Sequence, residues 1–234
     1  MDLVVVMEDL FSDRGVKSKA LTRSDLDSLC GLPRSLVDCD LQNLELSGLD
    51  LSGWRFERCR LSRADFSHTI LEGTAWLSCR AAFAKFFDSK LSDAEFVASD
   101  LNNSSFKGAD LNSAKFTQCK LTGADLTDAK ALAIVFDETL LINATLPGLS
   151  FRKSIMQRLD FSQADLHKCD FSQSSWIDCS LRGANVDGAR FEGADLRGAD
   201  LGGFRLTDAK LFRGATISRE QAGQLLSELG LNVR

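Results

Sequence analysis

Two copies of one short motif stand side by side near the C-terminus, Gly193-Ala194-Asp195-Leu196 and Gly198-Ala199-Asp200-Leu201. The same four residue types occur at Gly108-Ala109-Asp110-Leu111 and Gly123-Ala124-Asp125-Leu126. All four copies are separated by multiples of five residues. This spacing indicates an internal repeat, which has to be tested before any other feature of the fold.

Every fifth residue from Leu41 to Leu211 belongs to one class of side chain. Of these 35 positions, 33 are Leu, Phe, Trp, Met or Val, and the exceptions are Ala81 and Ala131. The position two residues earlier is Ala, Ser, Thr or Cys at 28 of 35 places between Cys39 and Ala209. Its exceptions are Leu44, Leu49, Trp54, Ile134, Leu149, Leu159 and Phe204. No slip interrupts this frame, so we expect regular structure throughout it.

A period of five fits neither a 3.6-residue helix nor the two-residue alternation of a strand. It predicts a chain that turns a corner every five residues and points one large and one small side chain inward on each side. Four such sides make a square coil of about 20 residues, and successive coils stack at the strand spacing of about 4.8 Å.

This pattern resembles the pentapeptide-repeat family, whose consensus is Ala-Asp/Asn-Leu-X-X. The resemblance covers residues 39–213. It implies an all-β fold, a right-handed quadrilateral β-helix of about nine coils and roughly 40 Å in length. We predict three parts: an N-terminal cap over 1–38, the β-helix over 39–213, and a C-terminal helix with a short strand over 214–234, for capping or dimerisation.

The large inward positions form one column of mostly aromatic residues, and the small inward positions hold most of the cysteines. The column reads Phe56, Trp76, Phe96, Phe116, Phe136, Met156, Trp176 and Leu196. We interpret it as a core stack, with an aromatic ligand box as the alternative. The small positions include Cys39, Cys59, Cys79, Cys119, Cys169 and Cys179. A metal site needs thiolates that converge on one point, so we predict buried thiols and no metal or cofactor.

Both ends depart from the repeat. We expect a strand over residues 3–11 and a short helix from Thr22 to Cys30, stopped by Gly31 and Pro33. An export or targeting segment is the alternative for this region. At the other end, Ser218-Arg219-Glu220-Gln221 has the form of a capping box, and Gly230 is a natural helix terminator. Leu231-Asn232-Val233 is a candidate short strand.

Composition excludes several classes of function. The formal net charge is −5, which is opposite to that of most nucleic-acid binders, so we expect no direct nucleic-acid binding. The first residues lack the basic leader of a secretory signal, and no stretch approaches the roughly 20 apolar residues of a membrane helix. We therefore expect a cytoplasmic bacterial protein. His68 and His167 lie at outward positions and form no catalytic arrangement, so we predict no catalytic residues and no enzyme activity.

The C-terminal tail, Ile217 to Leu231, resembles the terminal helix of the quinolone-resistance and gyrase-interacting pentapeptide proteins. That resemblance implies a homodimer of two rods joined end to end, a duplex-shaped DNA mimic that contacts DNA gyrase or topoisomerase IV and protects it from poisons. The implied dimer contacts are Ala222, Leu225, Leu226, Leu229, Leu231 and Val233. The chain departs from that group in two ways: its frame leaves no room for projecting loops, and its acidic residues are interleaved with basic ones.

A second hypothesis is a general interaction scaffold, or a delivered effector, that uses an apolar surface. Outward positions that are normally polar are apolar in several coils. The candidate partner patch consists of Leu77, Phe83, Phe87, Leu132, Leu140 and Ile142, with Val135 and Ile155 beside it. Local packing, or a bulge that takes these side chains inside, is the alternative interpretation.

Overall fold

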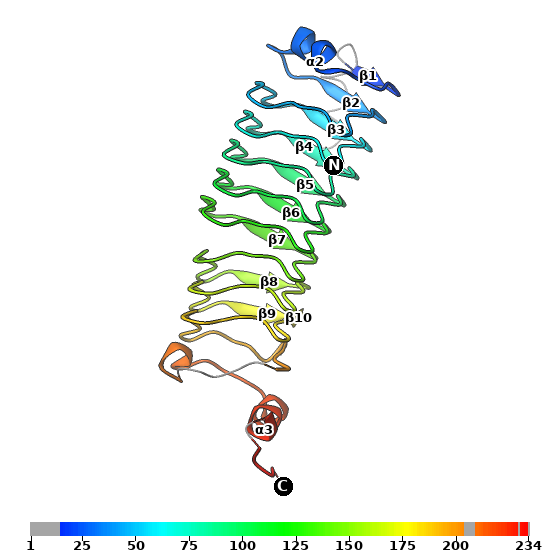
Figure 1. Cartoon of the computed structure of the whole chain (residues 1–234). Helices are drawn as coiled ribbons and strands as arrows, with labels where there is room; N and C mark the ends of the chain where they lie inside the picture. The colour runs from blue at the N-terminus through cyan, green and yellow to red at the C-terminus, as the bar shows by residue number, and fades with distance from the viewer. Residues whose placement is uncertain (1–14, 204–208, 229, 234) are drawn as a thin grey trace, which may run out of the picture.

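The chain folds into a rod-shaped parallel β-solenoid (Figure 1). The computed structural model describes residues 15–203, 209–228 and 230–233. Residues 20 apart are paired in parallel, as in Phe56 with Trp76 and Trp76 with Phe96. The predicted quadrilateral β-helix of about nine coils is therefore confirmed.

One face of the rod carries most of the strands, and the other faces are joined by isolated parallel bridges. Figure 1 shows β1 to β7 stacked along this face, with β8 and β9 following. In chain order the elements are β1 (Gly15–Lys17), α2 (Arg23–Leu29), β2 (Ser35–Val37), β3 (Arg55–Glu57), β4 (Ala75–Leu77), β5 (Glu95–Val97), β6 (Lys115–Thr117), β7 (Val135–Asp137), β8 (Ile155–Gln157), β9 (Ser175–Ile177), β10 (Cys179–Ser180), β11 (Ala199–Asp200), the 3-10 helix η1 (Ala209–Phe212) and α3 (Arg219–Glu228).

The repeated Asp residues shape the corners of the coil. The Asp50 carboxylate accepts hydrogen bonds from the Ser52 amide at 3.0 Å and from the Ser52 hydroxyl at 2.6 Å. These two bonds lower the pKa of Asp50, because they favour the charged carboxylate. Most corners also place a residue in the left-handed region, such as Asn103 with φ 55°. The Asp of the repeat is thus first a turn-forming residue.

The core is a set of stacked columns along the rod axis. The rings of Trp76 and Phe96 stack with centroids 5.3 Å apart, and those of Phe96 and Phe116 stack at 4.8 Å. The Trp76 indole donates a hydrogen bond to the Thr74 hydroxyl at 2.9 Å, so its one polar atom is satisfied inside the core. No ring of this stack is available to a ligand, since its members are buried.

The solenoid begins before residue 39, within the region predicted as a separate N-terminal cap. Strand β1 pairs with β2 in the same 20-residue register, with Val16 beside Leu36. Leu21 and the fully buried Leu26 continue the frame of large inward residues. The predicted helix is confirmed as α2, which replaces part of one coil, with Thr22 as its N-cap. The predicted strand over 3–11 lies outside the described residues.

The frame slips by one residue near the C-terminal end, contrary to the expectation from the sequence. In regular coils the amide of one residue donates to the carbonyl 19 residues later, as from Phe171 to Arg190. The amide of Phe191 instead donates to the carbonyl of Leu211, 20 residues later. Phe212, and not Leu211, therefore stacks on Phe191, with ring centroids 4.9 Å apart. The last coil contains one extra residue.

The backbone ladder is interrupted between the coil of β7 and the coil of β8. Within the described chain, no main-chain hydrogen bond joins residues 128–137 to residues 147–156, and β8 pairs with β9 but not with β7. The ladder resumes on both sides, where Leu126 donates to Thr145 at 2.8 Å and Glu138 donates to Gln157 at 3.1 Å. We call residues 128–137 and 147–156 the coil break.

Mismatched side-chain volumes explain the coil break. Leu149 fills a small inward position whose neighbours 20 residues away are Ala129 and Cys169. Ile134 likewise fills a position that is small in the adjacent coils. Conversely, Ala131 stands where the adjacent coils have Leu or Phe. Excess volume in a packed core forces the backbone to shift, and here the shift separates two coils.

Candidate functional site

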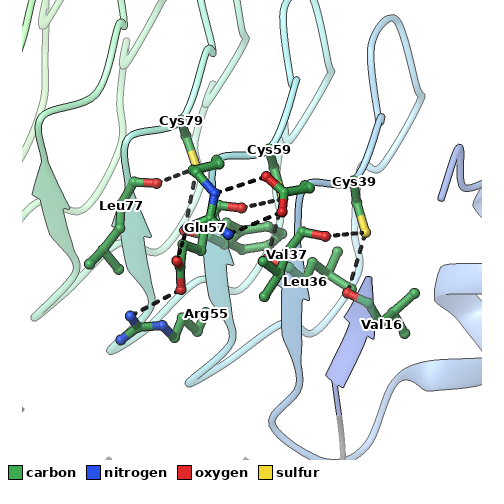
Figure 2. A network of polar contacts seen from close by, with 12 residues as sticks. Val16, Leu36, Val37, Cys39, Arg55, Glu57, Cys59, Leu77 and Cys79 are labelled. Carbon is green, nitrogen blue, oxygen red and sulfur yellow. Dashed lines mark hydrogen bonds and ion pairs between the residues drawn. The ribbon is translucent and has the colours of Figure 1, made fainter. Parts of the chain in front are cut away.

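The buried cysteines line the interior as hydrogen-bond donors. Figure 2 shows the thiols of Cys39, Cys59 and Cys79 in successive coils, each facing main-chain carbonyl groups. The Cys59 Sγ lies 3.3 Å from the carbonyl oxygen of Leu36, and the Cys79 Sγ lies 3.3 Å from that of Phe56. Sequence reasoning treated these residues as small apolar groups and missed this role. Ser99 and Thr139 stand in the same column and carry hydroxyl donors. Their presence could have indicated that this position calls for a hydrogen-bond donor.

Burial disfavours the thiolate form at most of these cysteines, whereas the hydrogen bond with Cys79 lowers the pKa of Cys59. Burial raises the pKa of Cys119 to about 11 and that of Cys169 to about 12, because the thiolate loses its hydration inside the rod. The pKa of Cys79 is raised by its contact with the Cys59 thiol and by burial. The thiolate is the nucleophile and the metal ligand. The buried thiols of the column are therefore donors to main-chain carbonyls of the coils.

Thiol reactivity tests this placement. In the folded protein we expect a disulfide reagent near pH 8 to modify only Cys30 rapidly, since it is the one half-buried cysteine among the seven. All seven thiols should react once the protein is unfolded, as measured by the absorbance of the released aromatic thiolate. Rapid modification of two or more thiols in the folded protein would contradict the buried column.

Most of the outward apolar residues are exposed on the surface. Exposed fractions are 79% for Leu132, 68% for Ile155 and 48% for Val135. Phe83, Phe87 and Leu140 are also exposed, whereas Leu77 and Ile142 are half-buried. The interpretation that a bulge takes these side chains inside is wrong for the exposed residues, because each keeps an outward place in its coil.

The candidate patch residues do not form one surface. Phe83 and Phe87 lie in an earlier coil and have their own partners: the Arg63 guanidinium lies 5.3 Å from the centre of the Phe83 ring, and the His68 ring packs edge-on to Phe87 at 5.4 Å. Leu132, Val135 and Ile155 instead belong to the coil break. Sequence reasoning found the residues but not this grouping.

Charged side chains pair across neighbouring coils. Lys85 contacts Asp65 at 2.9 Å, Lys115 contacts Glu95 at 2.8 Å, and each pair joins residues 20 apart. Other carboxylates pair within one corner, as Asp195 does with Arg197. The pKa of Asp195 is lowered mainly by its hydrogen bond from Arg197. The carboxylates of these pairs are therefore matched by adjacent cations.

Helix α3 caps the end of the solenoid. The predicted capping box is confirmed: the Ser218 hydroxyl accepts from the Gln221 amide, and the Gln221 carbonyl oxygen Oε1 accepts from the Ser218 amide at 2.6 Å. The Gln221 Nε2 donates to the carbonyls of Leu196 and Ala199, each at 2.7 Å. Gln221 thus supplies hydrogen-bond partners both to carbonyl groups at the end of the last coil and to the amide at the start of the helix.

The predicted dimer contacts divide between the two faces of the tail. Leu225 is buried and Ala222 is half-buried, so these two contribute to packing within one chain. Leu226, Leu231 and Val233 are exposed, while Leu229 lies outside the described residues. Helix α3 ends at Glu228, and in the turn beyond it the Gly230 amide donates to the Ser227 carbonyl and the Leu231 amide to the Leu226 carbonyl. The predicted strand over 231–233 is wrong, because these residues are not in strand conformation and pair with no strand of the described chain.

Other chemistry is sparse on the described surface. His167 contacts the Asp165 carboxylate at 2.9 Å, and His68 packs on Phe87 as described above. Within the described residues, no group of three or more His, Cys, Asp or Glu side chains is placed to hold a metal ion. The helices found there are also too short or too polar to cross a bilayer.

The sequence and the fold were compared with known proteins. A family model described as "Pentapeptide repeats (8 copies)" matches residues 35–74, 89–128, 135–173 and 177–211. No curated protein matches the sequence.

A solved structure of a resistance protein shares the fold. A trypsin-treated variant of QnrB1, a plasmid-mediated fluoroquinolone resistance protein, superposes with a TM-score of 0.57 at 22% identity, over 86% of this chain and 98% of that one. HetL, a pentapeptide-repeat protein involved in heterocyst differentiation regulation from the cyanobacterium Nostoc, gives a TM-score of 0.38 at 17% identity, over 92% of this chain and 94% of that one.

Proposed function

Because the chain belongs to the pentapeptide-repeat family, we propose that it is a non-catalytic rod that binds DNA gyrase or topoisomerase IV and protects it from poisons. The proposal places the protein in the bacterial cytoplasm, as a homodimer joined through α3. It confers antibiotic resistance or self-immunity through contact with a protein and not with nucleic acid. QnrB1 provides the functional precedent, as a resistance protein of the same fold.

The observation that carries the proposal is the arrangement of the C-terminal end. Helix α3 closes the last coil through Gln221 and Leu225, and it leaves Leu226, Leu231 and Val233 exposed beyond the rod. Exposed apolar side chains at a capped end suit self-association, because a second copy buries the same residues about a two-fold axis. Two rods joined in this way give one long, continuous surface.

The shape of the rod supports the proposed mimicry of DNA more than its charge does. The net charge is −5, and cross-coil pairs such as Lys85 with Asp65 match carboxylates with cations. Residues that stack along the rod also carry charges of both signs, as in the column of Asp40, Arg60, Arg80 and Asp100. We therefore propose that the topoisomerase is recognised by the width and straightness of the rod, with local charge fixing the register.

Gyrase supercoiling in the presence of a quinolone tests the proposal. Micromolar protein is expected to restore supercoiling that the drug inhibits. Leu226→Asp should abolish this protection, because a charge at the dimer contact prevents association. Light scattering should then give the mass of a monomer. Gln224→Asp is the matched control, because Gln224 is an exposed side chain on the same helix. It should retain both the dimer mass and the protection.

Two outcomes count against this function. The first is that the protein leaves supercoiling and its inhibition unchanged with both gyrase and topoisomerase IV. The second is that the wild type and Leu226→Asp have the same monomeric mass, which would remove the dimer from the proposal.

A protein-interaction scaffold is the second candidate function. The exposure of Leu132 and Ile155, at 79% and 68%, favours it, because contiguous apolar surface on a monomer marks interaction sites. This role requires no topoisomerase and no dimer.

A further inference from the structure

We propose that the coil break is a hinge, at which the parts of the rod on its two sides bend relative to each other. The inference stands on the break alone and does not depend on the proposed topoisomerase. Three features carry it: the backbone ladder is missing on two sides of the rod only, the core lacks stacked rings across the break, and no polar side-chain contact spans it within the described chain.

The ladder is open on two sides of the rod and continuous on the other two. On the open part, Lys130 pairs with Asp110 and Ser150 pairs with Asp170, but no bridge joins Lys130 to Ser150 in the described chain. On one of the other sides, parallel bridges run through the same level without interruption, along Ser105, Asp125, Thr145, Asp165 and Asn185. Two coils that are joined on one part of their rim and open on the rest can rotate about the joined part.

The core at the break lacks the stacking found in the coils before it. The rings of Phe116 and Phe136 stack with centroids 5.2 Å apart and an interplanar angle of 22°. Across the break, Phe136 meets Phe151 at 6.2 Å with the rings tilted by 51°. The next member of its own column is Met156, whose unbranched side chain adapts to irregular space. The core can therefore stay filled while the angle between the coils changes.

Polar side chains that tie neighbouring coils elsewhere do not tie these two. In a regular part of the rod, Lys115 contacts Glu95 of the preceding coil at 2.8 Å. Among the described residues, no ion pair or side-chain hydrogen bond joins 128–137 to 147–156. On the open sides the two coils are thus held together by apolar contacts, which are not directional.

Two opposing effects set the angle at the hinge. Leu149 and Ile134 are too large for small inward positions, and their volume holds the coils apart. Val135 and Ile155 stand 20 residues apart on the two edges of the open part, and both are exposed. Closing the break covers apolar surface of this pair, which favours closure. The angle is therefore set by a balance of packing effects and not by a rigid ladder.

Bending at this level changes the shape that the rod offers to a partner. The parts before and after the break keep their own structure, because each coil is supported by its immediate neighbours. The rod can therefore follow a curved partner surface by rotation at one level.

Distances between pairs of nitroxide spin labels in the full-length protein test the hinge. Labels at Glu95→Cys and Ser175→Cys lie four coils apart, about 19 Å along the axis, on a side where the ladder is open between them. Labels at Ser105→Cys and Asn185→Cys span the same number of coils on a side where the ladder is continuous. Both pairs are made in a Cys30→Ser background, since Cys30 is the one half-buried cysteine.

Double electron-electron resonance gives the distribution of each distance. We expect the distribution for the labels at residues 95 and 175 to be roughly twofold broader than that for the labels at 105 and 185, because a hinge moves its open side most. Equal widths for the two pairs would overturn the proposal, since the break would then be either rigid or loose on every side. This comparison needs no substitution in the core.

A repaired core provides the second arm of the test. The variant Ala131→Leu/Ile134→Ala/Leu149→Ala gives these three positions the side-chain volumes of the adjacent coils. It should restore the ladder and narrow the distribution at residues 95 and 175 to that at 105 and 185. The milder variant Leu149→Ala should narrow it in part. A folded triple variant that keeps the broad distribution would show that the motion does not arise at the coil break.

Discussion

Replacing Phe96 with alanine is expected to lower the free energy of unfolding by about 3–5 kcal/mol. The Phe96 side chain is fully buried and stacks between Trp76 and Phe116. Its removal leaves a cavity that the neighbouring coils cannot close, because each is held in register by its own backbone ladder. Urea unfolding followed by far-UV circular dichroism and by tryptophan fluorescence measures the loss.

Phe83→Ala is the control for this substitution. The same ring is removed, but it is 49% exposed and contacts the Arg63 guanidinium at the surface. We expect a loss of about 0.5–1 kcal/mol, the usual strength of an exposed cation–π contact. Equal losses for the two variants would contradict the stacked core.

The second large effect is expected at the C-terminal cap. Gln221→Leu keeps the size of the side chain but removes the donor to the carbonyls of Leu196 and Ala199. An unsatisfied buried polar group costs about 1–3 kcal/mol. The change leaves the Ala199 carbonyl without its donor, while the Leu196 carbonyl keeps the bond from the Ala199 amide, and the Ser218 amide loses its acceptor. Because each coil contacts only its neighbours, the loss should be local, freeing α3 and the last coil while the centre of the rod keeps its stability.

Hydrogen exchange resolves that local effect. Amides in 190–201 and 219–228 should exchange roughly a hundredfold faster in Gln221→Leu, and those in 91–121 should be unchanged. Gln224→Leu, an exposed substitution on the same helix, should change neither region. A uniform increase along the rod would mean that the cap supports the whole solenoid, contrary to the nearest-neighbour description.

The five-residue period was enough to predict the fold, because it constrains two inward positions on every side of every coil. It was not enough to locate the ends. Leu26 continues the frame, but it does so from helix α2, where five-residue spacing has no meaning. At the other end Leu211 and Phe212 are both apolar, and only the stacking of Phe212 on Phe191 shows which one points inward.

The sequence identified the residues of the candidate surfaces but not how those residues are grouped in space. Ala131, Ile134 and Leu149 were visible as exceptions to the repeat. These residues separate two coils because their volumes do not match those of the residues stacked above and below them. Such a mismatch involves several positions at once and cannot be read from one of them. The exposure of a side chain could not be predicted from its place in the repeat either. Leu77 and Leu132 both hold outward positions, but only Leu132 is exposed.

The 20-residue register gives the rod the symmetry of a fourfold screw. An insertion or deletion of one whole coil lengthens or shortens the rod and leaves every face where it was. A change of five residues preserves the inward pattern equally well, but it turns everything beyond it by a quarter of a revolution about the axis. The angle between the coil break and α3 is therefore set by the number of pentads between them, so it can change in steps of about 90° while every coil keeps its large and small inward positions.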